Sequence, residues 1–534
     1  MKTKKENNSQ DPKIANIGEE KSLESDQYNT IFRALSSKGD FIHKSDILSI
    51  LEKSGIQKKD PRIKDTMRNL TNVSDGEEIG VKKFEEIIHA NITLFEKAVN
   101  KSFVIPDFEL FKDEIKAIYE EVAKNDSGHN ADYIPQLARV DPDLFSVVFC
   151  SIDGQMVTLG DADENFCAQS TSKAVSYCIA LEANGQSKVH SHVGREPSGA
   201  KFNEITLNSK NLPHNPMINS GAIMICSLIK PELNLADRFE YITKVWDDLA
   251  GEGKVGFDNA VYHSEKETAN RNYALAHFMK EVGAFPDGSS IENVLDFYFQ
   301  CCSIQLSSRQ MARVLSTLAN GGISPLTNNK IFSSDTVKDC LSMMYSCGMY
   351  DFSGEYAFTV GLPAKSGVSG ALMIVVPNVG GFAVFSPKLD AHHNSAKGVD
   401  FSKRLVDRFN FHNYDSMAGL NKKIDPRKNQ LESSSDAILH FIWAASQGDI
   451  SEARRGISLG IDVNLGDYDK RTALHLAAAE GQYDMVEYLI KKGADVNVLD
   501  RWSNSPIVDA QDKDHSKIVK LLLDSGAKKI TNTK

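Results

Sequence analysis

The first part of the chain carries apolar residues at helical spacing. Between residues 27 and 104, apolar side chains recur three or four positions apart with polar breaks between the runs, as at Phe84, Ile87 and Ile88. Spacing of this kind places the apolar side chains on one face of a helix. The pattern predicts a small helical bundle over residues 27–104.

Two loops of this predicted bundle loosely resemble EF-hand loops. They are Ser37-Lys38-Gly39-Asp40 and Ser74-Asp75-Gly76-Glu77. Neither has the Asp-x-Asp-x-Asp-Gly-x5-Glu spacing that places oxygen ligands around a calcium ion. We therefore predict a bundle of EF-hand-like shape that does not bind calcium.

The middle of the chain, from about residue 105 to 420, changes from strands to helices and back. Residues 145–159 predict two strands joined by an Asp153-Gly154 turn, and residues 372–385 predict a second hairpin around 377–380. A mostly helical stretch runs between them to about residue 345. This order predicts an α+β domain, in which an antiparallel sheet lies beside a helical lobe.

The last hundred residues contain an internal repeat of 33 residues. GIDVN at 460–464 returns as GADVN at 493–497, and the middle unit reads TALHLAA over 472–478. In period and motif the repeat resembles the ankyrin repeat. We predict an ankyrin array over 434–530, with a divergent third unit as its cap. Such arrays bind proteins and carry out no chemistry of their own.

Composition and charge exclude several classes of protein. A net charge of −11 argues against a general nucleic-acid-binding surface. No apolar run reaches the roughly 18 residues of a membrane span. The eight cysteines, all between Cys150 and Cys347, form no Cys-x-x-Cys pair, which favours buried free thiols in a reducing compartment. Residues 1–26 are polar and lack the features of a signal or transit peptide, and we expect them to be disordered.

Two short motifs carry the chemistry. Ser170-Thr171-Ser172-Lys173 places a hydroxyl and an amine on one face of a helix. An amine in that position can take the hydroxyl proton and produce a serine nucleophile. Lys365-Ser366-Gly367, ahead of an apolar strand, is the second element of this arrangement in the serine penicillin-recognising enzymes. Together the motifs point to acyl transfer through a serine ester.

Longer motifs around these two establish a resemblance to a known family. They are QSTSK at 169–173, EPSG at 196–199, PHNPM at 213–217 with NSGA at 219–222, SE at 264–265, RN at 271–272, LDFYFQ at 295–300, CGMYDFSG at 347–354 and GLPAKSGV at 361–368. On these motifs, residues 105–420 resemble the serine-dependent glutaminases, which have a β-lactamase/DD-peptidase-like fold. From about residue 27 to 530, the chain resembles the animal kidney- and liver-type glutaminases.

The resemblance implies an amidohydrolase that converts L-glutamine to L-glutamate and ammonia through a glutamyl-serine intermediate. Ser170 is then the nucleophile, Lys173 its base and Tyr350 a proton relay to the leaving group. The backbone N–H groups of Ser170 and Val368 form the oxyanion hole. Lys173 needs a lowered pKa to act as a base near neutral pH. The residues leave open whether lysine or tyrosine is the principal base.

The resemblance also supplies a set of substrate contacts. They are Tyr133, Gln169, Ser170, Asn219, Glu265, Asn272, Tyr298, Tyr350 and Val368. The carboxylate of Glu265 suits the ammonium group of a free amino acid, and the amides and tyrosine hydroxyls suit its carboxylate and side-chain amide. A buried anion would disfavour peptides and penicillins, which lack that free cation.

These residues also have purely structural interpretations. The tyrosines can be core residues, the asparagines can form caps or turns, and Glu265 can be a first-turn helix acid. His190, His192 and His214 have no acidic or cysteine partner at metal-ligand spacing. We therefore expect neither a metal nor an organic cofactor.

Residues 199–208 correspond to a loop that, in the glutaminases that this chain resembles, links the assembly of subunits to activity. The regulatory positions are Phe202, Glu204, Ile205 and Thr206, and the relatives usually have lysine and phenylalanine where Glu204 and Thr206 stand. The departure leaves open how this chain responds to inorganic phosphate, the activator that the resemblance implies. The resemblance further implies homotetramers, filaments and a mitochondrial matrix location. The alternative location is cytoplasmic, because no transit peptide is visible.

Two other functions are less consistent with the sequence. A β-lactamase or peptidase-like hydrolase would carry a Ser-Asp-Asn element, which this chain lacks. A non-catalytic ankyrin scaffold would need neither Ser170 nor Lys173, and both are present. Glutaminase is therefore the predicted function.

Overall fold

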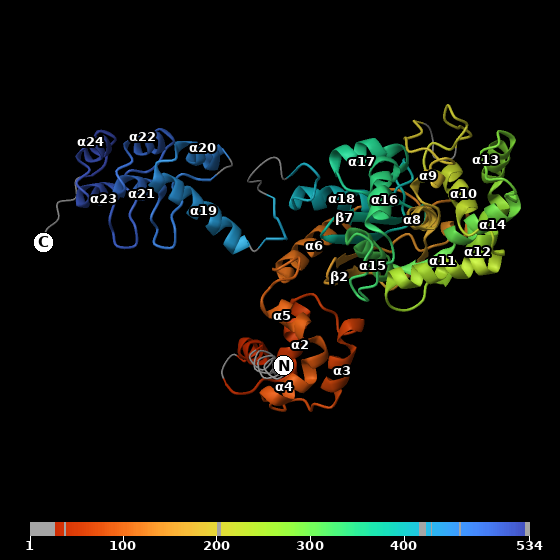
Figure 1. Ribbon diagram of the computed structural model, residues 1–534, viewed down its shortest axis with the longest axis horizontal. Coiled ribbons are helices and arrows are strands. Elements are labelled where there is room, and N and C mark those ends of the chain that lie inside the picture. The colour runs from red at the N-terminus through yellow and green to blue at the C-terminus, as the bar shows by residue number, and fades with distance from the viewer. Residues whose placement is uncertain are drawn as a thin grey trace, which may run out of the picture. The chain divides into compact units, whose positions relative to one another are not determined.

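The structure, a computed structural model, describes residues 27–36, 39–199, 204–415, 423–428, 430–458 and 461–528 (Figure 1). The chain divides into two compact units, residues 1–404 and 405–534. The predicted disordered segment 1–26 and the loop residues Ser37 and Lys38 lie outside the described residues.

The N-terminal region is a helical bundle, as predicted. Residues 27–35 are helical, and the later elements are α2 (Lys44–Lys53), η1 (Pro61–Ile63), α3 (Lys64–Thr71), α4 (Val81–Ile88), η2 (His89–Asn91) and α5 (Ile92–Val99). An antiparallel bridge joins the two loops, because Ile42 and Ile79 exchange backbone hydrogen bonds of 3.0 and 2.8 Å. Their buried side chains close the core between the two halves. This pairing gives the bundle its EF-hand-like shape.

An antiparallel five-stranded sheet forms the centre of the next domain. Its strands are β1 (Ser146–Ser151), β2 (Met156–Gly160), β6 (Ala364–Ser366), β7 (Ala371–Val376) and β8 (Gly380–Phe385), in the order β2-β1-β8-β7-β6. Both predicted hairpins are confirmed: β1 pairs with β2, and β7 pairs with β8. The tight turn of the second hairpin has Asn378 at φ 61°.

Helices cover both faces of this sheet. On one face, Phe149 and Phe382 are cross-strand partners. Phe149 contacts Phe111 of α6 (Phe108–Val122) at 5.0 Å between ring centroids, and Phe382 contacts Phe401 of α18 (Ala396–Arg408) at 5.6 Å. The other face packs on α15 (Ser308–Ala319). Because both faces are covered, β1, β7 and β8 are buried along their whole length without alternation.

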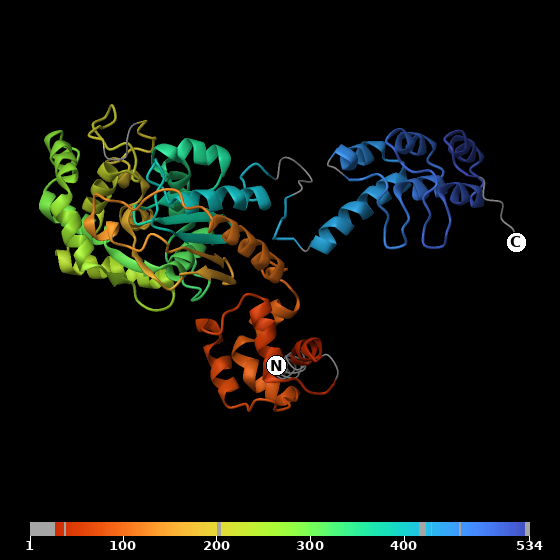
Figure 2. The same cartoon turned by 180° about the vertical axis from the view of Figure 1, so that it is seen from behind.

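A lobe of helices lies beside the sheet. It comprises α7 (Pro135–Ala138), η3 (Gln169–Thr171), α8 (Ser172–Asn184), α9 (Gln186–Val189), α10 (Asn219–Leu228), α11 (Leu235–Ala250), α12 (Asn259–Thr268), α13 (Asn270–Glu281), α14 (Ile291–Cys302), α16 (Ser334–Cys347), η4 (Tyr350–Phe352) and α17 (Ser353–Thr359). Figures 1 and 2 show α10 to α14 gathered at one side of this domain.

The lobe also contains a small sheet that the sequence did not predict. Its strands are β3 (Asn165–Cys167), β4 (Gly256–Phe257) and β5 (Ile304–Ser307), in the order β3-β5-β4. Strands of two to four residues are too short for their alternation to be recognised within a helical stretch. The insert is mostly helical, as predicted, and these short strands are an addition to it.

The C-terminal helices form ankyrin repeats, as predicted. They are α19 (Gln430–Gln447), α20 (Ile450–Ser458), α21 (Ala473–Ala479), α22 (Tyr483–Lys491), α23 (Pro506–Asp512) and α24 (Ser516–Asp524). Ala473, Ala477 and Ala478 are fully buried where α21 packs against α19 and α23. Small side chains at these positions let neighbouring repeats approach closely.

The cysteines are buried, as predicted, and none of the eight forms a disulfide. Within the described ranges, no helix combines the length and apolar character that crossing a membrane requires.

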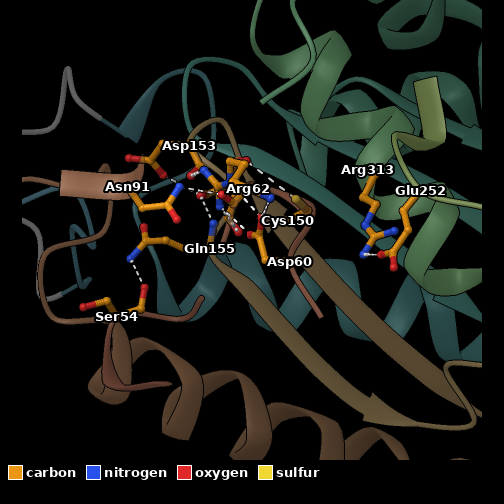
Figure 3. Close-up of polar contacts among 11 residues, drawn as sticks. Ser54, Asp60, Arg62, Asn91, Cys150, Asp153, Gln155, Glu252 and Arg313 are labelled. Carbon is orange, nitrogen blue, oxygen red and sulfur yellow. Dashed lines mark hydrogen bonds and ion pairs between the residues drawn. The ribbon is translucent and has the colours of Figure 1, made fainter. Parts of the chain in front are cut away.

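The helical bundle is attached to the edge strand of the five-stranded sheet. The Met156 N–H of β2 donates a hydrogen bond of 2.8 Å to the carbonyl of Gly55, in the bundle. Arg62 donates to the carbonyl of Asp153 at 2.6 Å and is held by the Asp60 carboxylate at 2.7 Å (Figure 3). The bundle therefore satisfies backbone groups that an exposed edge strand would leave open.

Substitution of Gly154 should test this attachment. Gly154 has φ 82°, and a Cβ there would lie 2.3 Å from Nη2 of Arg62. Gly288 has φ 79° and no atom within 4 Å of the same position, which makes it a matched control. The left-handed conformation costs alanine about 1–2 kcal/mol at both sites. Because only Gly154→Ala also displaces Arg62, calorimetry should show a larger fall in Tm for it than for Gly288→Ala. Equal falls would contradict this description of the attachment.

Candidate active site

Ser170 lies in a tight turn between β3 and α8. Gln169, the residue before it, adopts φ 46°, a left-handed conformation that is unfavourable for a residue with a side chain. The hydroxyl groups of the next two residues stabilise the turn, since Thr171 donates to the carbonyl of Ala168 at 2.5 Å and Ser172 to that of Gln169 at 2.7 Å. The turn holds the Ser170 side chain in a fixed position at the start of the helix.

Lys173 reaches Ser170 directly. Its Nζ lies 2.7 Å from Oγ of Ser170 and 2.7 Å from Oδ1 of Asn219. Asn219 in turn donates from Nδ2 to Oδ1 of Asn272 at 3.0 Å. Lys173 is only 2% exposed, and this burial lowers its pKa to about 8. Both recorded acceptors are uncharged, so a substantial fraction of the amine is neutral near physiological pH.

Glu265 is the second buried ionisable group of the site. It is 8% exposed, and Gln169 donates from Nε2 to its carboxylate at 3.1 Å. Burial raises the pKa of Glu265 to about 7, while the hydrogen bond from Gln169 and the charge of Lys173 act in the opposite direction. A carboxylate in this setting gains most from a ligand that brings a cation.

Tyr350 lies against the strand that carries Lys365 and Ser366. Its hydroxyl donates to the carbonyl of Ser366 at 3.1 Å, and burial raises its pKa, so it is protonated at neutral pH. Gly348, two residues earlier, permits the close approach, because a Cβ there would lie 1.8 Å from the carbonyl oxygen of Ala364. Tyr350 itself has φ 54°.

The side chain of Lys365 is a part of the site to which sequence reasoning gave no role. Its Nζ donates to the carbonyls of Ser366 at 2.7 Å and Gly348 at 3.2 Å, and it lies 4.6 Å from the centre of the Tyr350 ring. It is fully buried, and this burial, with the nearby charge of Lys173, holds its pKa well below the usual range. Its place in the Lys365-Ser366-Gly367 motif, just before a buried strand, was the available signal.

Most of the predicted substrate contacts converge on Ser170. Asn272 and Tyr298 are buried, and Val368 packs in one apolar cluster with Tyr350. Tyr133 differs, because 51% of it is exposed. Burial of its hydroxyl, and then the proximity of Tyr350 and Glu265, raise its pKa.

Three of the four predicted regulatory positions are among the described residues. Phe202 falls outside the described residues. Glu204 is exposed, Ile205 is 42% exposed and Thr206 is half-buried.

Of the histidines considered as metal ligands, His190, His192 and His214, the first two have hydrogen-bond partners within the fold. His190 bonds the hydroxyl of Tyr177 at 2.8 Å, and His192 bonds the carbonyl of Ala284 at 3.0 Å. Within the described ranges, no cluster of three or more histidine, cysteine or acidic side chains is arranged to hold a metal ion.

The fold is of the β-lactamase-like class, and comparison with known proteins identifies the family within that class. The glutaminase family profile matches residues 128–414, the ankyrin repeat profile (3 copies) matches 432–533 and the EF-hand domain profile matches 27–106. The chain belongs to the glutaminase family. It is an amidohydrolase that converts L-glutamine to L-glutamate.

Similar proteins share this organisation over most of their length. The chain is 43% identical over 489 residues to the mitochondrial glutaminase liver isoform of Rattus norvegicus, a match that covers 90% of this chain and 81% of the rat protein. It is 45% identical over 483 residues to putative glutaminase 3 of Caenorhabditis elegans, covering 88% and 83%.

Solved structures match the catalytic part. A probable glutaminase, ybaS, is 35% identical with a TM-score of 0.54, and the match covers 56% of this chain and 97% of that one. A probable glutaminase from Bacillus subtilis complexed with 6-diazo-5-oxo-L-norleucine is 30% identical with a TM-score of 0.50, covering 57% and 95%.

The two shifted pKa values predict the pH dependence of turnover. Glu265 must be ionised to attract an ammonium group, and its carboxylate forms as the pH rises through about 7. Lys173 must be neutral to act as a base, and its neutral form appears as the pH rises through about 8. We therefore expect kcat/KM for glutamine to rise from about pH 6 to about pH 9, more steeply at the acidic end.

Glu265→Gln distinguishes the two groups. The substitution should raise KM for glutamine, and the rise of kcat/KM near pH 7 should disappear while the rise near pH 8 remains. A wild-type kcat/KM that is constant or falls over this range would contradict the assignment.

Proposed function

We propose that glutamine hydrolysis in this protein proceeds through a glutamyl ester on Ser170, with Lys173 as the base. The observation that carries the proposal is the 2.7 Å contact between Nζ of the buried Lys173 and Oγ of Ser170. In its neutral form the amine has a lone pair, which can accept the hydroxyl proton of Ser170 at this distance between Nζ and Oγ. The lowered pKa of about 8 supports a populated neutral form.

The first half of the reaction forms the ester. Lys173 takes the hydroxyl proton as Oγ of Ser170 attacks the side-chain amide carbon of glutamine. The N–H groups of Ser170 and Val368 donate to the oxyanion that develops. The C–N bond then breaks, and the nitrogen leaves as ammonia after receiving a proton from Lys173, directly or through Tyr350. Its protonated hydroxyl makes Tyr350 a suitable relay.

The second half releases glutamate. A water molecule attacks the ester carbon and gives a proton to Lys173. The ester C–O bond breaks, and the proton returns to Oγ of Ser170. Both halves use the same base, which therefore ends the cycle neutral.

Recognition of the free amino acid rests on charge. Glu265 supplies the buried carboxylate that the ammonium group requires, and its raised pKa supports a preference for cationic ligands. Asn219, Asn272 and Tyr298 provide amides and a hydroxyl for the carboxylate and side-chain amide of the substrate. A carboxylate of this kind would leave peptide amides unbound, because they carry no cation there.

Replacement of the nucleophile tests the mechanism. Ser170→Ala should lower kcat by about 10⁴-fold or more, because the oxyanion hole cannot replace a nucleophile. Ser176→Ala, a buried serine on the same helix α8, is the matched control and should retain the wild-type rate. Ammonia release from glutamine, with L-asparagine alongside, gives both rates. Substantial turnover by Ser170→Ala would contradict the serine-ester mechanism.

We further propose that the protein assembles into homotetramers through the loop at 204–206, and that inorganic phosphate activates them. The resemblance to animal glutaminases and the exposed apolar side chain of Ile205 support this proposal. Filaments of tetramers are expected on the same grounds. The mammalian relatives named as mitochondrial isoforms support a mitochondrial location, which cell fractionation would distinguish from a cytoplasmic one.

Ile205→Lys tests the assembly. It should reduce the fraction of tetramer seen by light scattering in phosphate, since a buried interface disfavours an unpaired charge. Leu233→Lys replaces another exposed aliphatic side chain of the same domain and should leave the fraction of tetramer unchanged. An identical mass distribution for Ile205→Lys and the unmodified chain would contradict an interface at this loop.

The ankyrin array is a protein-interaction domain, and we propose that its turns form the contact surface. Tyr468 and Trp502 stand exposed on successive turns, with Arg501 lying over both rings at 5.9 and 4.6 Å. Exposed aromatic and arginine side chains are enriched at protein interfaces.

A further inference from the structure

A cavity lies where the helical bundle meets the catalytic domain, away from Ser170. We call it the seam cavity. It measures about 650 Å³ and is lined by α2 and the loop after it, by β2, and by α15 with the end of β5. A volume of this size is typical of sites for small organic ligands.

One part of the seam cavity is apolar. Leu51 from α2, Phe108 from the start of α6 and Met156 from β2 contribute buried side chains to its lining. They come from both sides of the seam, so the surface depends on the attachment of the bundle to β2. An apolar group placed here would contact both domains at once.

The rest of the lining has an excess of positive charge. Lys58, Lys59, Lys112, Arg309 and Arg313 face three acidic residues. Two of those acids are already neutralised, since Asp163 pairs with Arg309 at 2.6 Å and Glu252 with Arg313 at 2.8 Å. Among the described residues no ion pair is recorded for the three lysines. The surplus charge favours an anion.

Arg313 is a buried cation in this lining and is 8% exposed. It donates from Nη2 to the carboxylate of Glu252 at 2.8 Å (Figure 3). One carboxylate does not use all the N–H donors of a guanidinium, so Arg313 retains donors for an anion in the cavity.

Strand β5 connects the lining of the seam cavity to the turn that contains Ser170. Ser307, at the end of β5, contributes to the cavity and pairs with Asn165 of β3. Three residues earlier on the same strand, the carbonyl of Ile304 accepts a hydrogen bond of 2.7 Å from the N–H of Ala168. Ala168 begins the turn that holds Ser170. A shift of β5 would therefore move the turn that holds Ser170.

We propose that the seam cavity binds a small organic anion with an apolar body, and that its occupancy changes the rate of glutamine hydrolysis. The carboxylate, phosphate or sulfonate group of such a ligand lies at Arg313 and Lys112, and the apolar body lies on Leu51, Phe108 and Met156. The ligand is an effector, since no step of the reaction takes place there.

Binding is measured on the full chain with 1-anilinonaphthalene-8-sulfonate, whose fluorescence rises when it leaves water. N-phenyl-1-naphthylamine has the same aromatic body without the anion and serves as the uncharged control. We expect saturable binding of the sulfonate and an affinity about tenfold weaker for the uncharged compound.

Three variants locate the site. Lys112→Glu is exposed on α6 and should weaken sulfonate binding about tenfold without affecting folding. Arg313→Gln should weaken it as well. Lys116→Glu, one turn further along α6 and 59% exposed at its side chain, is the matched control and should bind normally. If Arg313→Gln fails to fold, Lys112→Glu decides the result.

Turnover of glutamine is then measured with and without the sulfonate. A change in kcat that is present in the unmodified chain and in Lys116→Glu, and lost in Lys112→Glu, supports the proposal. Equal affinity for the charged and uncharged compounds overturns it, as does equal affinity of Lys112→Glu and Lys116→Glu. Binding that leaves turnover unchanged overturns the effector role.

Discussion

The site depends on one buried contact, that between the amine of Lys173 and the hydroxyl of Ser170. Burial removes water from the ammonium group, and the two recorded acceptors that replace it, Ser170 and Asn219, are uncharged. A carboxylate bonded to Lys173 would restore the ordinary pKa of the amine and abolish its use as a base near neutral pH. The asparagine pair of Asn219 and Asn272 therefore does what an acidic residue could not, because it orients the amine without charging it.

The turn that contains Ser170 joins this base to substrate recognition. Gln169 directs its amide to Glu265, and the next residue is the proposed nucleophile. The left-handed backbone conformation of Gln169 lets its side chain and that of Ser170 point in different directions. On the opposite side, Lys365 and Tyr350 share the carbonyl of Ser366 as their acceptor. The strand that leads to Val368, the expected oxyanion donor, is thus held by two buried side chains.

Sequence reasoning succeeded where a pattern repeats or a motif is long. The two hairpins, the helical bundle and the 33-residue repeat follow from local periodicity and are all present. The small β3-β5-β4 sheet was missed, because strands of two to four residues are too short to show the alternation of apolar and polar residues. The strained conformations of Gln169 and Tyr350 and the contacts of Lys365 were not predictable, since they depend on close approach between segments far apart in the chain. The seam cavity depends in the same way on the attachment of the bundle to an edge strand.

The central claim is that Ser170 becomes acylated while Lys173 acts as its base. Rapid acid quenching of the enzyme during glutamine turnover, followed by mass spectrometry of its peptides, tests this most directly. The account predicts a glutamyl group in ester linkage on Ser170, which accumulates at a pH where attack is faster than release. A glutamyl group on any other side chain, or steady turnover through direct attack of water with no acylated peptide at any quench time, would contradict it.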